Sequence, residues 1–296
     1  MTEELKKDIV ERKITSGDNY IKALRKVVYN MFLITLKSIS NNIFDLDPVA
    51  IECKKIYIDV NSCLSIMFRG DQYNTEECTN ELQKILEKFM NEMILNKIQL
   101  IFLFTLEPSQ AHIDVFPDWC KERYSRVNLM KSDFLKKFLV AIKSYSEKNN
   151  SIKLINTHKV HPALVVYQNE VKNKKRFLVL SKDLVFQCIN LKNCSVWNGS
   201  NFVDMDNPNR DLPDSIELAE PDILLPYALA LMGSTREEFK GMPLYGPYKS
   251  SKYINKYKIE IKLGVDHPLK EHLDKYSVLF DIHKLLEVNK QDIPIV

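Results

Sequence analysis

Residues Glu220–Tyr257 have the sequence EPDILLPYALALMGSTREEFKGMPLYGPYKSSKYINKY, and this stretch decides how the rest of the chain is interpreted. Apolar residues at helical spacing stop at Gly233. After a polar turn, Gly241 and Gly246 bracket Met-Pro-Leu-Tyr ahead of a lysine-rich segment. The pattern predicts two helices joined by a glycine-bracketed hairpin.

The start of the second predicted helix has the chemistry of a phosphate site. A glycine-rich turn exposes backbone N–H groups, and a helix N-terminus adds the positive end of its dipole. Lys249, Ser250, Ser251 and Lys252 add charge and hydroxyl groups there. A plain loop between packed helices has the same spacing, however, and the stretch is not a P-loop because Gly246 is followed by Pro-Tyr-Lys.

Upstream of this stretch, the chain predicts an α/β fold with a doubly wound, mostly parallel sheet. A long helical pattern separates the first two buried strands, and this β-α-β order requires a right-handed parallel crossover. The predicted strands are Lys55–Ser62, Gln99–Phe104, Ile152–Asn156 and Arg176–Gln187.

Asp59 ends the first of these strands, where chemistry is usually located in an open parallel sheet. It is the best catalytic candidate in the chain. A strand-end aspartate that caps the following helix would give the same pattern.

Composition places the chain among globular intracellular proteins. Its 296 residues carry a net charge of +3, so any nucleic-acid surface must be local. No apolar run is long enough to span a membrane, and the charged N-terminus is unlike a signal peptide. Six scattered cysteines without a Cys-x-x-Cys pair are typical of reduced, buried residues. We expect a reducing compartment, either the cytoplasm or a viral replication site. Abundant Lys, Asn and Ile suggest an AT-rich genome such as that of a large DNA virus or phage.

The two ends of the chain are predicted to be helical additions to one α/β domain. Residues 1–54 form an amphipathic extension whose basic face is either a solvated face or a contact for membrane or nucleic acid. We assign a protein contact to this extension. Residues 55–260 form the α/β domain, and residues 261–296, with a predicted helix over Leu269–Leu286, pack on it.

The motif pair Tyr227–Gly233 (YALALMG) and Gly241–Lys249 (GMPLYGPYK) resembles the flap endonuclease and 5′–3′ exonuclease family. The similarity lies at that family's helix-hairpin-helix-like DNA-binding element. It implies a PIN-like fold, with a mostly parallel sheet flanked by helices. The stretch around Asp59 resembles the setting of the family's first metal-binding aspartate.

The stretch Phe116–Arg126 (FPDWCKERYSR) resembles the part of the family that approaches the scissile phosphate with basic residues. Guanidinium groups fit phosphate oxygens, and Trp119 and Tyr124 offer stacking faces. A surface helix anchored by its tryptophan explains the stretch equally well. The resemblance implies DNA contacts from Lys121, Arg123 and Arg126, in addition to those predicted for Gly241, Gly246, Lys249, Ser250 and Lys252.

Several of the family's acidic residues are missing. Thr105 stands where an aspartate follows the second strand, and Ser234 replaces another acid. The stretch His158–Ala163 has no acid, and its histidines are expected to be surface or capping residues without a carboxylate neighbour. The stretch Arg176–Gln187 resembles a further motif of the family but lacks two residues where that motif has Gly-Asp. The resemblance leaves Asp59, Asp183 and Glu237 as metal-binding or catalytic candidates, with Asp114 or Glu170 as substitute acids.

These losses favour a flap-endonuclease-like protein that has lost its chemistry, because two-metal hydrolysis needs several carboxylates. We expect a DNA-binding pseudo-nuclease that needs no cofactor and positions a protein partner in replication, repair or transcription. The first alternative is an active Mg²⁺- or Mn²⁺-dependent 5′ nuclease with a reduced metal site. The second is a protein-contact scaffold that does not bind DNA.

Overall fold

The computed structural model describes the α/β part of the chain and most of its C-terminal helices. The described residues are 54–61, 87, 90–91, 94–95, 97–105, 107–118, 120–121, 133–181, 183–197, 202–207, 210, 212–213, 216–233, 239–288 and 293–294. The predicted N-terminal extension, residues 1–54, lies outside them except for its last residue.

One six-stranded sheet organises the described part of the chain, in the order β3-β2-β1-β4-β5-β6. All neighbouring strands are parallel except β5 and β6, which are antiparallel. The mostly parallel α/β architecture predicted from the sequence is therefore confirmed. The strands are β1 (Lys55–Asp59), β2 (Gln99–Phe104), β3 (Ile152–Asn156), β4 (Phe177–Leu180), β5 (Cys194–Trp197) and β6 (Phe202–Asp204).

The strand order reverses between β1 and β4, and this places the carboxyl ends of those strands at a topological switch point. Ile58 of β1 lies beside Leu180 of β4, and Asp59 lies beside Leu103 of β2. In open parallel sheets, ligands bind in the crevice at such a point. A functional site is therefore expected among the residues that follow β1, β2 and β4.

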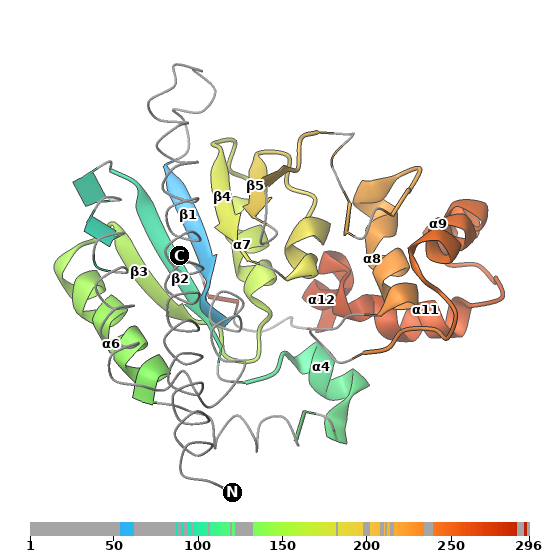
Figure 1. Cartoon of the computed structure of the whole chain (residues 1–296), viewed down its shortest axis with the longest axis horizontal. Helices are drawn as coiled ribbons and strands as arrows, with labels where there is room; N and C mark the ends of the chain where they lie inside the picture. Colours follow the sequence, from blue (N-terminus) through green and yellow to red (C-terminus); the bar gives the residue numbers. More distant parts are fainter. Residues whose placement is uncertain are drawn as a thin grey trace, which may run out of the picture.

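Helices lie on both sides of the sheet and extend beyond it. Figure 1 shows α6 alongside β3 and the group α8, α9, α11 and α12 at the opposite side of the molecule. The predicted helix over Leu269–Leu286 is three shorter elements. The helical elements are α4 (Gln110–Val115), α6 (Asp133–Lys148), α7 (Pro162–Glu170), η3 (Leu184–Cys188), α8 (Pro221–Met232), α9 (Pro247–Lys256), α10 (Lys258–Leu263), α11 (Lys270–Tyr276), η5 (Ser277–Leu279) and α12 (Ile282–Val288).

An apolar cluster joins one face of the sheet to α7, α8 and the C-terminal helices. Tyr57 of β1 and Phe177, at the start of β4, are fully buried and meet edge to face, with ring centroids 5.8 Å apart. Most apolar residues of α7 and α8 are buried in the same cluster, as are Leu273 of α11 and Leu285 of α12. The C-terminal helices therefore share the core of the sheet.

Cys120, Cys188 and Cys194 are buried and form no disulfide with one another, as their scattered spacing predicted. No helix among the described residues has both the length and the apolar character needed to cross a membrane.

Candidate functional site

Asp59 ends β1 at the carboxyl edge of the sheet, and only 1% of its surface is exposed. Ser181 directly follows β4, the neighbouring strand, and its Oγ donates a 2.7 Å hydrogen bond to Asp59 Oδ2. A buried carboxylate needs such a donor because burial removes its water. Asp59 is therefore at the strand end that the sequence predicted, and one of its oxygens is bound by this chain.

Asp183 lies beside Asp59 in the same hydrogen-bond network. Its Oδ1 accepts from Val185 N–H at 3.0 Å and so caps η3, while its Oδ2 lies 3.1 Å from His161 Nε2. The Asp183 N–H donates to Ser181 Oγ at 3.0 Å. The Ser181 hydroxyl thus connects the two surviving acids, and both carboxylate oxygens of Asp183 face donors of this chain.

His161 caps α7 and contacts Asp183 at the same time. Its Nδ1 accepts from Ala163 N–H at 3.1 Å, so the neutral ring carries its proton on Nε2, which faces Asp183. The predicted capping role is confirmed. The expectation that this histidine has no carboxylate neighbour is wrong. His161 precedes Asp183 by 22 residues in the sequence, but α7 places it at the edge of the sheet where β4 ends, next to the Asp183 carboxylate.

Thr105, at the position of a missing acid, is turned away from the carboxylates. Its N–H donates to Asn61 Oδ1 at 2.9 Å, and its carbonyl accepts from Asn61 Nδ2 at 2.8 Å. Its hydroxyl contacts the carbonyl oxygens of His158 and Glu107. These contacts join the ends of β1 and β2 through an amide side chain, where the sequence had indicated only a polar turn.

The two acids considered as substitutes do not reach Asp59. Asp114 is exposed on α4 and accepts from Gln110 Nε2 at 2.7 Å. Glu170 is fully buried, but it binds Lys55 and Tyr57 at 2.6 Å each, near the opposite end of β1. Burial and this contact with Glu170 raise the pKa of Tyr57 far above its usual value.

A divalent metal does not fit the acids that the structure describes. Within that part of the chain, no three His, Cys, Asp or Glu side chains are grouped so that they could hold an ion. Mg²⁺ prefers octahedral oxygen coordination, whereas Asp59 and Asp183 face internal donors. Glu237, the third predicted metal-binding residue, lies outside the described residues.

The connection between α8 and α9 closes through two glycines. Gly233 and Gly241 have φ values of 86° and 66°, and a Cβ on either one would overlap backbone atoms of the facing segment. Met242 N–H donates to Leu231 O at 2.8 Å and fastens this approach. Gly246 differs, because its φ is −86° and the space around its Cβ position is open.

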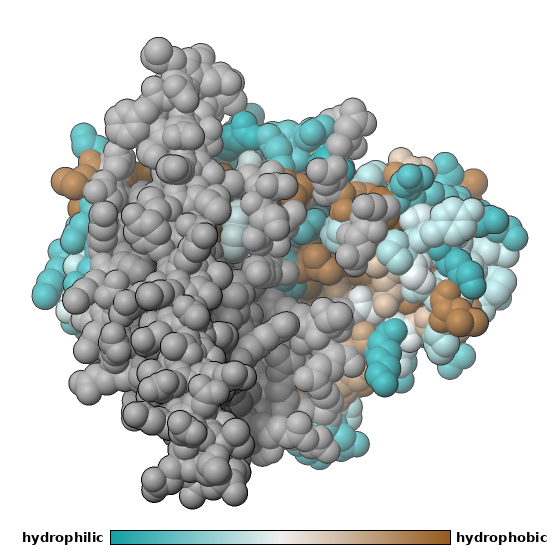
Figure 2. Space-filling view, viewed as in Figure 1, coloured by the Kyte–Doolittle hydropathy of each residue, from teal (hydrophilic) through white to brown (hydrophobic). Residues whose placement is uncertain are grey.

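The exposed side of α9 carries lysines, and its buried side carries serines. Lys249 and Lys252 are exposed, as is 77% of Tyr248. Figure 2 shows a mostly hydrophilic surface where Figure 1 places α9, with small hydrophobic patches beside it. Ser250 is fully buried, so its predicted hydroxyl contact with DNA requires correction. Ser251 donates to Pro247 O at 2.8 Å and accepts from Glu217 N–H at 3.1 Å.

The basic stretch after α4 begins close to this connection. Phe116 packs against Phe239 and Tyr276, with ring centroids 5.7 and 5.8 Å apart. Lys121 is exposed and lies 4.0 Å from the exposed Asp118 carboxylate. The other predicted contacts of this stretch, Arg123 and Arg126, and its stacking candidates, Trp119 and Tyr124, lie outside the described residues.

A tyrosine–histidine contact that the sequence did not reveal fixes the far side of α9. Tyr253 OH accepts from Leu269 N–H at 2.8 Å and lies 2.9 Å from His267 Nδ1. Burial, and next the nearby Lys270, hold the pKa of His267 below its usual value. Burial also raises the pKa of Tyr253. This contact ties the loop before α11 to the middle of α9.

No family model and no curated protein sequence matches the chain. Solved structures do match. They include the bacteriophage T5 5′-exonuclease with bound zinc, at a TM-score of 0.59 and 11% identity, over 80% of this chain and 94% of that one. A bacteriophage T5 flap endonuclease variant in a pseudo-enzyme–product complex with DNA and metal ions matches at a TM-score of 0.54 and 11% identity, over 80% and 99%. The chain therefore has the flap endonuclease and 5′–3′ exonuclease fold, of the PIN-like type.

Proposed function

We propose that this chain, which has the flap-endonuclease fold, binds duplex or flap DNA without cutting it and positions the DNA for a partner in replication, repair or transcription. The observation that carries the proposal is that Asp59 and Asp183 are hydrogen-bonded within the chain. Ser181 donates to Asp59, and both oxygens of Asp183 face donors of this chain. Two-metal hydrolysis instead requires carboxylates that bind ions about 4 Å apart.

Lysines on α9 support the DNA-binding part of the proposal. Lys249 and Lys252 are exposed and have no acidic partner among the described residues. Exposed lysines at the start of a helix can contact phosphates, and Tyr248 offers a ring on which a base can stack. Phe116 brings the basic stretch that begins at Lys121 close to the same connection. A flap endonuclease with this fold has been described in complex with DNA, which adds support.

The experiment measures binding and cleavage of 5′-flap and nicked duplexes in the same samples, with Mg²⁺ and with Mn²⁺. We expect binding that weakens as salt rises, without cleavage, because phosphate contacts release counterions. Lys249→Glu and Lys252→Glu should each weaken binding and lower the salt slope by about one unit or more. Lys172→Glu is the charge-matched control, since Lys172 is exposed in the turn after α7.

Three results would change the proposal. Cleavage that Asp59→Ala abolishes, in a variant that keeps the wild-type circular dichroism, would establish the nuclease with a reduced metal site. Binding that Lys172→Glu weakens as much as Lys249→Glu would remove α9 as the DNA surface. The absence of both binding and cleavage would favour the protein-contact scaffold.

A further inference from the structure

The sheet ends at β3, and this strand has one free edge within the described residues. β3 pairs with β2 on one side only. Leu100 N–H donates to Ser151 O, and Thr157 N–H donates to Phe104 O. The backbone N–H and C=O groups of the odd-numbered residues of this strand therefore point toward β2. Successive residues of a strand alternate in direction, and the remaining backbone groups therefore point outward. They belong to Ile152, Leu154 and Asn156.

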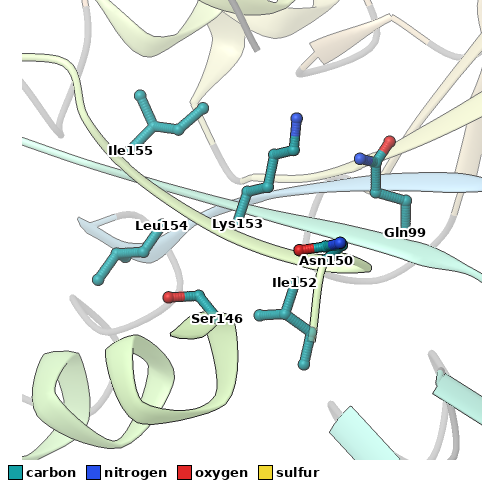
Figure 3. Close-up of a pocket in the computed structure, with 7 residues that line it drawn as sticks. All are labelled: Gln99, Ser146, Asn150, Ile152, Lys153, Leu154 and Ile155. Carbon is teal, nitrogen blue, oxygen red and sulfur yellow. The ribbon is translucent and has the colours of Figure 1, made fainter. Parts of the chain in front are cut away.

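An open groove follows this free edge. It has a volume of about 600 Å³ and is lined by Gln99, Ser146, Asn150, Ile152, Lys153, Leu154 and Ile155. Figure 3 shows Lys153 and Ile155 on one side of β3 and Ile152 and Leu154 on the other, toward Ser146 at the end of α6. Side chains from both faces of one strand can line a single groove only where the groove runs along the edge.

The lining of the groove indicates what it would bind. Lys153 is half-buried and has no acidic partner among the described residues, so an acidic group placed opposite it would be attracted. Leu154 and Ile155 are half-buried apolar side chains on the two sides of the strand. Ile152 N–H already donates to Asn149 O at 3.0 Å, but no backbone contact with another described residue uses Leu154 N–H or Asn156 N–H.

We propose that an extended segment of a partner protein, with an acidic residue between apolar ones, adds to β3 as a further strand. Strand addition uses the outward backbone groups for affinity and the alternating side chains for specificity. A lysine on an edge strand discourages indiscriminate pairing, which leaves acidic segments as the matching class.

A second copy of this chain fits the edge less well. A five-residue strand buries far less than the roughly 1,200–2,000 Å² of a stable protein interface, whereas short peptides bind sheet edges routinely. The β3 edge and α9 lie at opposite sides of the molecule in Figure 1. A partner bound at β3 would thus leave α9 accessible to DNA, and this proposal stands even if DNA binding fails.

The test uses the full-length chain, labelled with ¹⁵N, and two capped peptides as probes. One peptide is Thr-Val-Glu-Val-Glu-Val-Thr, and the other has lysine in place of glutamate. The acidic peptide should slow hydrogen exchange at the Leu154 and Asn156 amides by about tenfold or more. The Lys153 and Ile155 amides should not change, because they already face β2. The lysine peptide should bind more weakly by about tenfold or more.

Two variants complete the test. Leu154→Pro removes an outward N–H and should abolish peptide binding, while Lys153→Glu leaves the backbone intact and should reverse the preference toward the lysine peptide. The Lys153→Glu result decides the matter if Leu154→Pro does not fold. No protection with millimolar acidic peptide, or an unchanged preference in Lys153→Glu, would overturn the proposal. A wild-type dimer that Leu154→Pro dissociates would overturn it as well, in favour of a second copy.

Discussion

Ser181 holds two buried carboxylate residues at once. Its Oγ donates to Asp59 Oδ2 and accepts the Asp183 N–H. Alanine at this position would remove a donor from a carboxylate that is 1% exposed, and losing a hydrogen bond to a buried charged group costs about 1.5–3 kcal/mol. We expect Ser181→Ala to lower the free energy of unfolding by about this amount in urea denaturation.

Ser146→Ala provides the matched control for this experiment. The Ser146 hydroxyl donates to Lys143 O on α6, in an exposed hydrogen bond. Its loss should change the free energy of unfolding by less than about 0.5 kcal/mol. Equal effects of the two substitutions would mean that the Ser181 contacts add nothing to stability.

His267 makes stability depend on pH. Tyr253 OH accepts Leu269 N–H, so it donates its own proton to His267 Nδ1 only while that nitrogen is unprotonated. The folded-state pKa of His267 lies below 6.5, so the unfolded chain binds more protons between the two pKa values. This stability is present above pH 6.5 and is lost as the pH falls through the folded-state pKa.

We therefore expect the urea midpoint of the wild type to fall more between about pH 7 and about pH 5 than that of His267→Gln. His158→Gln, at an exposed histidine, should keep the wild-type pH dependence. The same pH dependence in His267→Gln as in the wild type would exclude this contact as its source.

Among the secondary-structure elements, the α8–α9 connection contains three glycines whose replacement by alanine should have different effects on stability. Alanine at Gly233 or Gly241 would require a positive φ and would overlap facing backbone. Backbone strain alone should cost about 1–3 kcal/mol at each position. Gly246→Ala has open space and an extended backbone, and it should leave the thermal midpoint nearly unchanged. A large loss in Gly246→Ala alone would contradict this account of the connection.

The ends of these helices were predictable because their signals are local. Gly233 ends α8, and Pro247 begins α9 after Gly246, as the residue order indicated. β5 and β6, with four and three residues, were not among the predicted strands. The stretch predicted to continue the fourth strand instead forms η3, because the Asp183 side chain caps it.

The site contacts were less predictable, because they join distant parts of the chain. No local pattern pairs Asp59 with Ser181, 122 positions away, or His161 with Asp183. The burial of Ser250, in contrast, was predictable from the spacing of apolar residues on its helix. Ile254, also buried, follows it four residues later on the same face of α9. A serine on that face belongs to the core rather than to the phosphate surface.

At the scale of the whole molecule, a near-neutral net charge of +3 limits where DNA can bind. The sheet, its switch point and the helices of the flap-endonuclease fold are present, while the described acids at the switch point serve hydrogen bonding. Under the proposed function, such a molecule keeps a surface for DNA, because lysines on α9 do not depend on the carboxyl edge for their exposure. The proposal therefore requires that DNA binding and hydrolysis be separable in this fold.

Metal dependence of stability provides the sharpest test of that separation. A ligand that binds only the folded state, at a hundred times its Kd, stabilises it by about 2.7 kcal/mol. This raises the thermal midpoint of a chain of this size by about 4 °C. Because Asp59 and Asp183 already face donors of this chain, we expect about 10 mM Mg²⁺ or Mn²⁺ to shift the midpoint by less than about 1 °C, and EDTA to have no effect. A concentration-dependent rise that Asp59→Asn abolishes would instead mean that the ion displaces Ser181 and His161. That outcome would favour the active nuclease with a reduced metal site.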